Sequence, residues 1–172
     1  MRIQRKRFIV PLLAVLLVSA ASGWSSTQPV HAPHAIVASV HELASQAGVG
    51  IMQAGGNAID GAVATGFALA VVYPQAGNLG GGGFMLIRMA DGRTHFLDYR
   101  EKAPASATAN MYLDAQGNVI DNASIVGYKA IGVPGSVAGM VFAQKNYGRL
   151  TLAQVLAPAI KLARDGYPLT WE

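Results

Sequence analysis

The chain has 172 residues, with 13 lysines and arginines against nine aspartates and glutamates, and a formal net charge of +4. It has no cysteine, which excludes disulfides, thiolate metal sites and a cysteine nucleophile within the chain. Four of the basic residues lie before residue 24, so the remainder carries nine charges of each sign and offers no basic patch for nucleic acid.

The N-terminus has the pattern of an export signal. A basic stretch around Arg5 precedes an apolar run of about 14 residues, and small residues suited to signal peptidase follow near Ala21. The alternative is a membrane anchor, but a membrane span needs roughly 20 apolar residues. We therefore predict a signal peptide over residues 1–23 and a mobile mature N-terminus over residues 24–34. Export without disulfides favours a bacterial periplasm.

A pair of helices is predicted next. We expect Ser39 to cap a helix from about His41 to Ala54, which has apolar residues at helical spacing and two glycines after it. Asn57 then caps a second helix that extends to about Val72. Asp60 is the third residue of this helix, where an acidic side chain suits the positive end of the helix dipole. The helix is apolar on nearly all sides, which is typical of a buried helix.

Four consecutive glycines, Gly80–Gly83, open into a predicted β-hairpin. Its strands are expected at Phe84–Met89 and Arg93–Tyr99, joined by a two-residue turn at Asp91-Gly92. Glycine loses more backbone entropy on folding than any other residue. A run of four therefore indicates that the backbone passes very close to another group, or adopts angles that other residues avoid. Arg100 follows directly after the hairpin.

The rest of the chain is predicted to be irregular over about 104–129 and helical over about 136–146. Thr151 then caps a last helix through Asp165, in which Pro158 should kink or restart the helix. Helix pairs combined with an antiparallel hairpin indicate an α+β layered fold rather than a regular doubly wound one.

The common ligand motifs do not fit this pattern. A Walker loop needs a lysine after its last glycine, and a Rossmann fingerprint needs a helix after its glycines, whereas Gly80–Gly83 precede a strand. The four histidines are far apart or lie in the N-terminal segment, so neither a metal site nor a cofactor site is predicted. Asp98 and Glu101 flank Arg100, and ion pairing with it suits them better than acid–base catalysis.

Arg100 is the candidate substrate-binding residue. It stands at the end of a strand, where a guanidinium can hold a substrate carboxylate through two parallel hydrogen bonds. The alternative is a structural ion pair with Asp98 or Glu101, and on composition alone this is the stronger of the two interpretations.

Longer blocks of the sequence resemble the N-terminal part of the γ-glutamyltranspeptidase (glutathione hydrolase) family. The block NLGGGGFM at residues 78–85 and the block REKAP at residues 100–104 occur in the order found in the family, and the similarity covers about Ala35 to Thr170. Two such blocks in the right order are far more specific than any single short motif.

The resemblance implies an N-terminal-nucleophile hydrolase with a four-layer αββα sandwich, of which residues 35–172 form an incomplete large-subunit domain. It implies export as a zymogen and autocatalytic cleavage into two subunits, the new N-terminal threonine of the small subunit forming the acyl-enzyme. The substrates are then glutathione and other γ-glutamyl compounds, and the γ-glutamyl group passes to water, an amino acid or a peptide. The alternative is a non-catalytic γ-glutamyl-binding or regulatory module.

The resemblance places one site residue in this chain. The arginine that binds the α-carboxylate of the γ-glutamyl group maps onto Arg100, which reverses the preference for an ion pair. The nucleophile belongs to a Thr-Thr-His-x-Ser-like segment beyond residue 172, so no catalytic residue is expected here, and the chain alone should be inactive. Residues 93–96, Arg-Thr-His-Phe, echo that segment but lie in the hairpin and lack its first threonine. Gly80–Gly83 are expected to be scaffold rather than an oxyanion hole.

Overall fold

The computed structural model describes residues 29–77 and 79–169. The chain divides into two compact units, Met1–His34 and Ala35–Glu172. The predicted signal peptide lies outside the described residues. Residues 29–34 form neither helix nor strand, and the mobile N-terminus stays a prediction. The described helices and strands all belong to the second unit.

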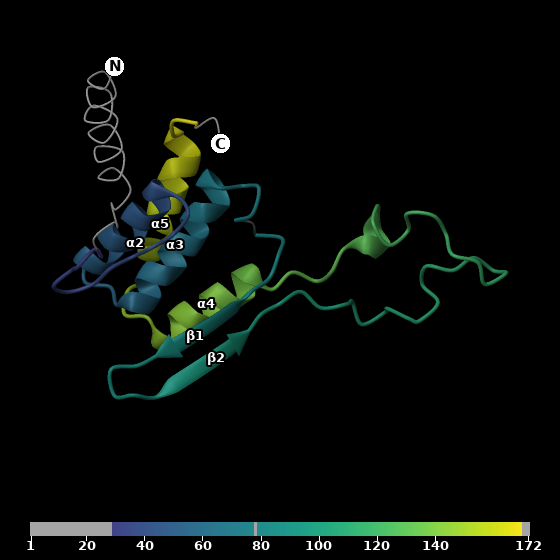
Figure 1. Ribbon diagram of the computed structural model, residues 1–172, viewed down its shortest axis with the longest axis horizontal. Coiled ribbons are helices and arrows are strands. Elements are labelled where there is room, and N and C mark those ends of the chain that lie inside the picture. Colours follow the sequence, from purple (N-terminus) through teal and green to yellow (C-terminus); the bar gives the residue numbers. More distant parts are fainter. Residues whose placement is uncertain (1–28, 78, 170–172) are drawn as a thin grey trace, which may run out of the picture. The chain divides into compact units, whose positions relative to one another are not determined.

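Three helices pack around one another, with α3 in the middle (Figure 1). They are α2 (Glu42–Gln53), α3 (Ala58–Val72) and α5 (Leu152–Asp165), and α4 (Ser136–Tyr147) lies against α3 and the hairpin. Helix α5 is continuous through Pro158, so the restart offered by the sequence does not occur. In the described part of the chain, no helix has the length and apolar character needed to cross a membrane.

Helix α3 begins with the predicted Asn57 cap, and Asp60 completes a capping box there. The side-chain oxygen of Asn57 accepts the N–H of Asp60 at 3.1 Å, and the Asp60 carboxylate accepts the N–H of Asn57 at 3.0 Å. Most of the helix is buried, as its apolar sequence predicts, and Val63, Ala64 and Ala68 have no exposed surface.

Helix α2 differs from the prediction at its start. Its N-cap is His41 rather than Ser39, because Nδ1 of His41 accepts the N–H of Leu43 at 3.2 Å. The Ser39 hydroxyl instead donates to the carbonyl of His41 at 2.9 Å and lies 2.8 Å from the hydroxyl of Ser45. Serine is a common cap, but here the imidazole of His41 accepts one of the N–H groups left free at the start of the helix, that of Leu43.

The carboxylate of Asp60 is fully buried where α3 meets the loop between α4 and α5. Besides the N–H of Asn57, it accepts the N–H groups of Arg149 at 2.8 Å and Leu150 at 3.4 Å, and the side-chain amide of Gln144 at 3.3 Å. A buried carboxylate is tolerated when hydrogen bonds replace its lost water. Asp60 therefore joins three segments, a role beyond the local one predicted from its place in the helix.

The hairpin pairs β1 (Phe84–Arg88) with β2 (Thr94–Asp98) in antiparallel register. Its loop is longer than the predicted two residues, because the N–H of Met89 bonds the carbonyl of Arg93 at 2.8 Å and leaves three residues between them. Gly92 closes the loop in the left-handed region, with φ of 88°, as in the common three-residue hairpin loop.

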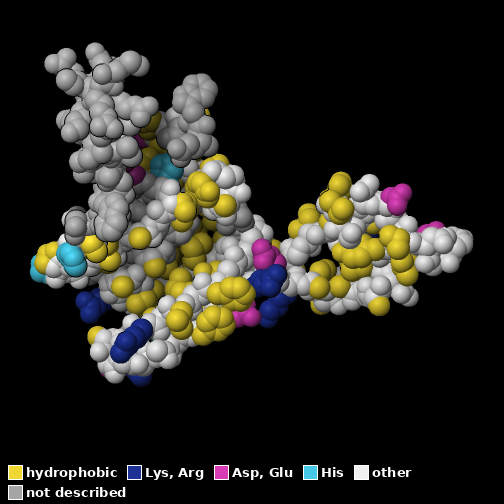
Figure 2. Space-filling view, in the orientation of Figure 1, with side chains coloured by type: hydrophobic (Ala, Val, Ile, Leu, Met, Phe, Trp, Pro, Cys, Tyr) yellow, Lys and Arg dark blue, Asp and Glu magenta, His cyan; other side chains and the backbone are white. Residues whose placement is uncertain are grey.

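The two faces of the hairpin differ. Ile87 is buried toward the helices, whereas Phe84, Leu86 and Phe96 are exposed on the other face, where the two phenylalanine rings stack 5.8 Å apart. Figure 2 shows apolar side chains gathered along this hairpin. The sheet of the described residues has only these two strands. The mixed helix-and-strand prediction is therefore confirmed, while a second sheet is not part of what is described.

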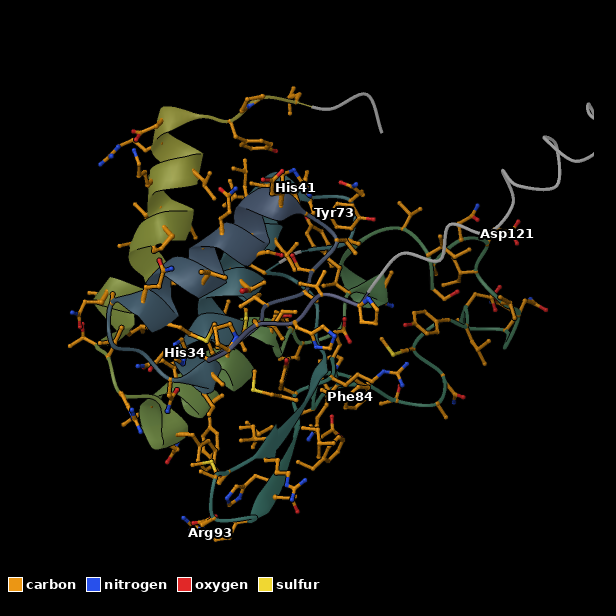
Figure 3. All side chains as sticks on the ribbon, turned by 60° about the vertical axis from the view of Figure 1, so that its left-hand side comes forward. His34, His41, Tyr73, Phe84, Arg93 and Asp121 are labelled. Atoms are coloured by element: carbon orange, nitrogen blue, oxygen red, sulfur yellow. The ribbon has the colours of Figure 1, made fainter. Side chains whose placement is uncertain are left out.

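A long excursion, residues 103–133, separates the hairpin from α4 and contains only the short 3-10 helix η1 (Tyr128–Ala130). Figure 3 shows Asp121 within it, Arg93 at the tip of the hairpin and Phe84 at the opposite end. Two backbone hydrogen bonds between Lys102 and Val133, of 3.2 and 2.8 Å, close its base. The end of β2 is thereby brought next to the start of α4.

Candidate functional site

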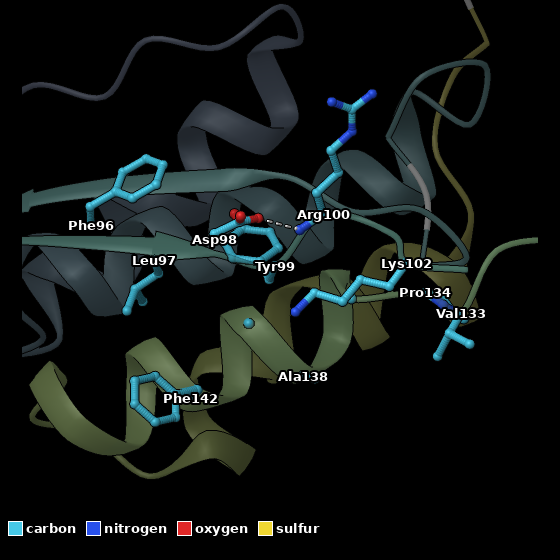
Figure 4. A pocket seen from close by; sticks show the side chains of 12 residues that line it. Phe96, Leu97, Asp98, Tyr99, Arg100, Lys102, Val133, Pro134, Ala138 and Phe142 are labelled. Carbon is cyan, nitrogen blue, oxygen red and sulfur yellow. Dashed lines mark hydrogen bonds between the residues drawn. The ribbon is translucent and has the colours of Figure 1, made fainter. Parts of the chain in front are cut away.

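A pocket of about 470 Å³ lies between the end of β2 and helix α4 (Figure 4). Its walls are mainly apolar, and three charged residues belong to its lining. The lining residues are Phe96, Leu97, Asp98, Tyr99, Arg100, Lys102, Val133, Pro134, Gly135, Ala138, Gly139 and Phe142. The one residue that the sequence selected for substrate binding is therefore at the rim of a pocket.

The Arg100 side chain is exposed and points away from α4 (Figure 4). The ion pairs among the described residues are Arg93–Asp91, Lys161–Asp165 and Arg164–Asp165, so Arg100 takes part in none of them. The Asp98 carboxylate instead accepts the backbone N–H of Arg100 at 3.1 Å. The structural ion pair with Asp98 or Glu101 is thus not formed in the described part of the chain, and the guanidinium is accessible to a ligand.

The glycine run packs against the backbone around Arg100. A β-carbon at Gly82 would lie 2.5 Å from the nitrogen of Glu101 and 2.7 Å from Cα of Arg100. One at Gly83 would lie 2.9 Å from the ring of Tyr99. Real β-carbons do not come within 3.0 Å of other heavy atoms in this way, so close packing explains both glycines, as a scaffold role predicts.

Two more glycines approach the same place from the start of α4. A β-carbon at Gly135 would lie against the carbonyl of Tyr99, 2.7 Å from its carbon, and one at Gly139 would overlap the Tyr99 ring. The Tyr99 hydroxyl donates to the carbonyl of Phe84 at 3.4 Å. Burial of the ring raises the pKa of the Tyr99 hydroxyl above its ordinary value. Glycines from two segments thus enclose one aromatic side chain.

The other glycines of the run have different roles. The carbonyl of Gly81 accepts the N–H groups of Gly135 at 2.9 Å and Ser136 at 3.0 Å, which caps the start of α4 in place of a side chain. A β-carbon at Gly80 would meet nothing within 4 Å. Close packing therefore accounts for Gly82 and Gly83 but does not require a glycine at position 80.

The hairpin segment that echoes the family's nucleophile serves packing. The ring of His95 lies 4.7 Å from that of Tyr147, which joins β2 to α4. Within the described ranges, no group of three His, Cys, Asp or Glu side chains could hold a metal ion.

The sequence reasoning missed Tyr99, Gly135 and Gly139. The signal was present, since the last two are four residues apart and lie on one face of a helix. That spacing shows that something large lies against the helix, but not which residue it is, because the partner is more than 35 positions away in the chain.

Comparison with known sequences identifies relatives over most of the chain. The sequence profile of the family described as Gamma-glutamyltranspeptidase matches residues 44–172. A glutathione hydrolase proenzyme from Pseudomonas sp. (strain A14) is 58% identical over 145 residues, which cover 84% of this chain and 25% of the relative. An acylase ACY 1 proenzyme from Pseudomonas sp. (strain SE83) is 44% identical over 149 residues, which cover 83% of this chain and 27% of the relative.

A solved structure agrees with the sequence comparison. The γ-glutamyltranspeptidase of Helicobacter pylori matches with a TM-score of 0.75 and 55% identity, over 81% of this chain and 40% of that chain. This chain spans about a quarter of the length of the curated relatives it matches. Sequence and fold therefore agree that the chain belongs to the γ-glutamyltranspeptidase family and corresponds to its N-terminal portion.

Proposed function

We propose that this chain is the N-terminal part of an exported, periplasmic γ-glutamyltranspeptidase precursor, and that Arg100 binds the α-carboxylate of the γ-glutamyl donor. The observation that carries the proposal is the accessible guanidinium of Arg100, which has no ion-pair partner among the described residues although two carboxylates stand beside it in the sequence. An arginine fork can hold a carboxylate through two parallel hydrogen bonds.

The chemistry of the proposed reaction is acyl transfer. The γ-glutamyl group of glutathione or a related compound would pass to a threonine hydroxyl and then to water, an amino acid or a peptide. The threonine would lie in the small subunit of the same precursor, released by autocatalytic cleavage. In this division of roles, residues 35–172 supply the carboxylate-binding arginine and no nucleophile.

The exposed face of the hairpin supports the four-layer part of the proposal. Phe84, Leu86 and Phe96 have 55%, 76% and 63% of their surface exposed, on one face of a sheet with two strands in the described chain. An αββα sandwich would bury such a face against its second sheet, since apolar sheet faces are stable only when covered. The second sheet would come from the remainder of the precursor, including the small subunit.

The first test is the substitution Arg100→Lys in the full-length precursor that carries this chain. Lysine keeps the charge but cannot form the fork, whose charge-assisted hydrogen bonds contribute about 1.5–3 kcal/mol. The KM for γ-glutamyl donors should therefore rise by roughly tenfold or more, measured by steady-state kinetics. Arg93→Lys, at the exposed hairpin tip, is the matched control and should leave KM unchanged. An unchanged KM in Arg100→Lys would return Arg100 to a structural role.

A second test concerns the nucleophile and the alternatives. Sequencing the gene beyond codon 172 should reveal an open frame with a Thr-Thr-His segment, and its absence would contradict the precursor. The non-catalytic module would instead require the chain alone to unfold cooperatively and to bind glutathione. The acylase relative raises a second enzymatic candidate, which predicts that the purified precursor cleaves an amide without a γ-glutamyl group faster than it cleaves glutathione.

A further inference from the structure

Four glycines from two segments lie against Tyr99 and the two residues that follow it. β-Carbons built on them would all come within 3.0 Å of atoms of Tyr99, Arg100 or Glu101. The glycines are Gly82, Gly83, Gly135 and Gly139. Only residues without a β-carbon allow the run before β1 and the start of α4 to approach this backbone so closely.

On the basis of the carboxylate-binding role proposed for Arg100, we propose that Tyr99 is a positioning residue for it. The Tyr99 ring, enclosed by Gly83 and Gly139, fixes the backbone from which the Arg100 guanidinium projects. Tyr99 would not touch the substrate, and its effect would pass entirely through the placement of Arg100.

The backbone hydrogen bonds at this place support the inference. The N–H of Tyr99 bonds the carbonyl of Gly83 at 3.0 Å, and the N–H of Arg100 bonds the carboxylate of Asp98 at 3.1 Å. The guanidinium itself has no partner in the described part of the chain that would hold it in place. Its direction therefore depends on the backbone, and a backbone fixed before binding reduces the entropy lost when the substrate carboxylate is captured.

Two helical glycines allow a matched comparison. Gly139 in α4 and Gly50 in α2 both occupy helix interiors, where glycine is less favourable than alanine. A β-carbon at Gly50 would meet nothing within 4 Å, whereas one at Gly139 would overlap the Tyr99 ring. If Gly139 is needed mainly to admit that ring, alanine there should do more harm while the ring is present than once residue 99 is reduced to its β-carbon, which would still lie 2.5 Å from the new one.

The experiment uses the full-length precursor and two donors, a γ-glutamyl anilide and the 4-aminobutyryl anilide that lacks only the α-carboxylate. The readout is the ratio of kcat/KM for the first donor to that for the second. Both values come from one preparation, so the ratio does not depend on the fraction of active enzyme. A general loss of folding lowers both values together, whereas a displaced carboxylate-binding group lowers only the first.

Tyr99→Ala should lower this ratio by about tenfold, mainly through KM of the γ-glutamyl donor. Tyr99→Phe should retain it, because the ring remains and only the 3.4 Å hydroxyl contact is lost. Gly139→Ala should lower the ratio, Gly50→Ala should not, and Gly139→Ala should lower it less in the Tyr99→Ala background, where only the contact with the β-carbon of residue 99 remains. Tyr99→Leu, which keeps a large apolar side chain, provides a milder variant and should give an intermediate ratio.

The outcomes separate the inference from the function on which it rests. A ratio unchanged by Arg100→Lys contradicts the carboxylate-binding role itself. A ratio lowered by Arg100→Lys but unchanged in Tyr99→Ala, Tyr99→Leu and Gly139→Ala overturns the positioning role alone. Equal losses for both donors in the Tyr99 variants also overturn it, because they assign Tyr99 to general stability.

Discussion

Asp60 and Arg100 are both charged, and they mark two regions with opposite properties. Asp60 lies fully buried at the junction of α3 with the α4–α5 loop, and three backbone N–H groups and one amide donate to its carboxylate. Arg100 is exposed at the end of β2 and has no ion-pair partner among the described residues. Both nevertheless belong to well-packed backbone, through hydrogen bonds at Asp60 and through close glycine contacts at Arg100.

The difference separates a structural charge from one available for binding. A buried charge whose hydrogen bonds are complete holds segments together and has no capacity left for a ligand. An exposed charge gains little from surface ion pairs, and the unpaired guanidinium of Arg100 keeps its hydrogen-bonding capacity free for a ligand. The predictions that follow test whether this separation holds.

The largest expected effect is that of Asp60→Ala. It leaves the part-buried N–H groups of Asn57, Arg149 and Leu150 without their acceptor, and a donor left unsatisfied away from water destabilises by about 1–3 kcal/mol. We expect a loss of about 3 kcal/mol or more, seen as a lower melting temperature of the full-length protein. Asp121→Ala, on the exposed excursion, is the control. Equal losses of melting temperature in the two variants would contradict the structural role of the buried Asp60 carboxylate.

Gly82→Ala should give the next largest effect, because it tests the rigid base of Arg100. The new β-carbon would meet backbone atoms of Arg100 and Glu101 at 2.5–2.8 Å, and backbone cannot move aside as a flexible side chain can. Overpacking of this kind costs about 1–3 kcal/mol. Gly80→Ala, in the same run but with open space around it, should be neutral or slightly stabilising. The melting temperatures of the two variants decide whether the glycines are scaffold.

The two regions also differ in how far sequence could predict them. The Asn57 cap and the place of Asp60 in the first turn are local, within four positions, and were predicted correctly. The bonds from Asp60 to Gln144 and Arg149 join residues more than 80 positions apart, and no periodicity in the sequence encodes them. Local rules also failed at Ser39, where His41 supplied an equivalent acceptor.

At the site, local rules predicted less. The hairpin and the place of Arg100 after it followed from turn signals and alternation, but its preferred partner on composition was a neighbouring carboxylate. The family resemblance reversed that preference, and the structure shows the ion pair unformed in the described chain. The enclosure of Tyr99 by glycines from two segments depends on tertiary contact, so the glycine run alone could indicate close packing without naming its partner.

Asn57→Ala should have a smaller effect at the structural junction. The side chain caps α3 by accepting the N–H groups of Ile59 and Asp60, and it also donates to the carbonyl of Tyr147 at 2.6 Å, so alanine removes two local hydrogen bonds and one tertiary one. We expect a destabilisation of about 1–2 kcal/mol. Asn110→Ala, an exposed asparagine on the excursion, is the matched control. A comparable loss in Asn110→Ala would show that the cap and the bond to Tyr147 contribute nothing beyond the loss of an asparagine side chain.

Asp165 provides the smallest expected effect and the sharpest test of the comparison, because it is charged, paired and exposed. Hydrogen bonds from Arg164 and then Lys161 lower the pKa of its carboxyl to about 2. When folding lowers the pKa of a carboxyl, that carboxyl stabilises the folded state at pH values above its unfolded pKa. This contribution is lost as the pH falls toward 2.

Solvent screens the two basic partners of Asp165, so Asp165→Asn should leave the melting temperature unchanged at pH 7. The acid dependence of unfolding should be nearly the same in the variant and the original protein. A clear destabilisation at pH 7 that disappears near pH 2 would show that exposed pairs contribute here as buried ones do. In that case an ion pair at Arg100 would also have stabilised the fold, and its absence would need ligand binding as an explanation. If exposed pairs contribute little, the absence of this pair costs almost no stability.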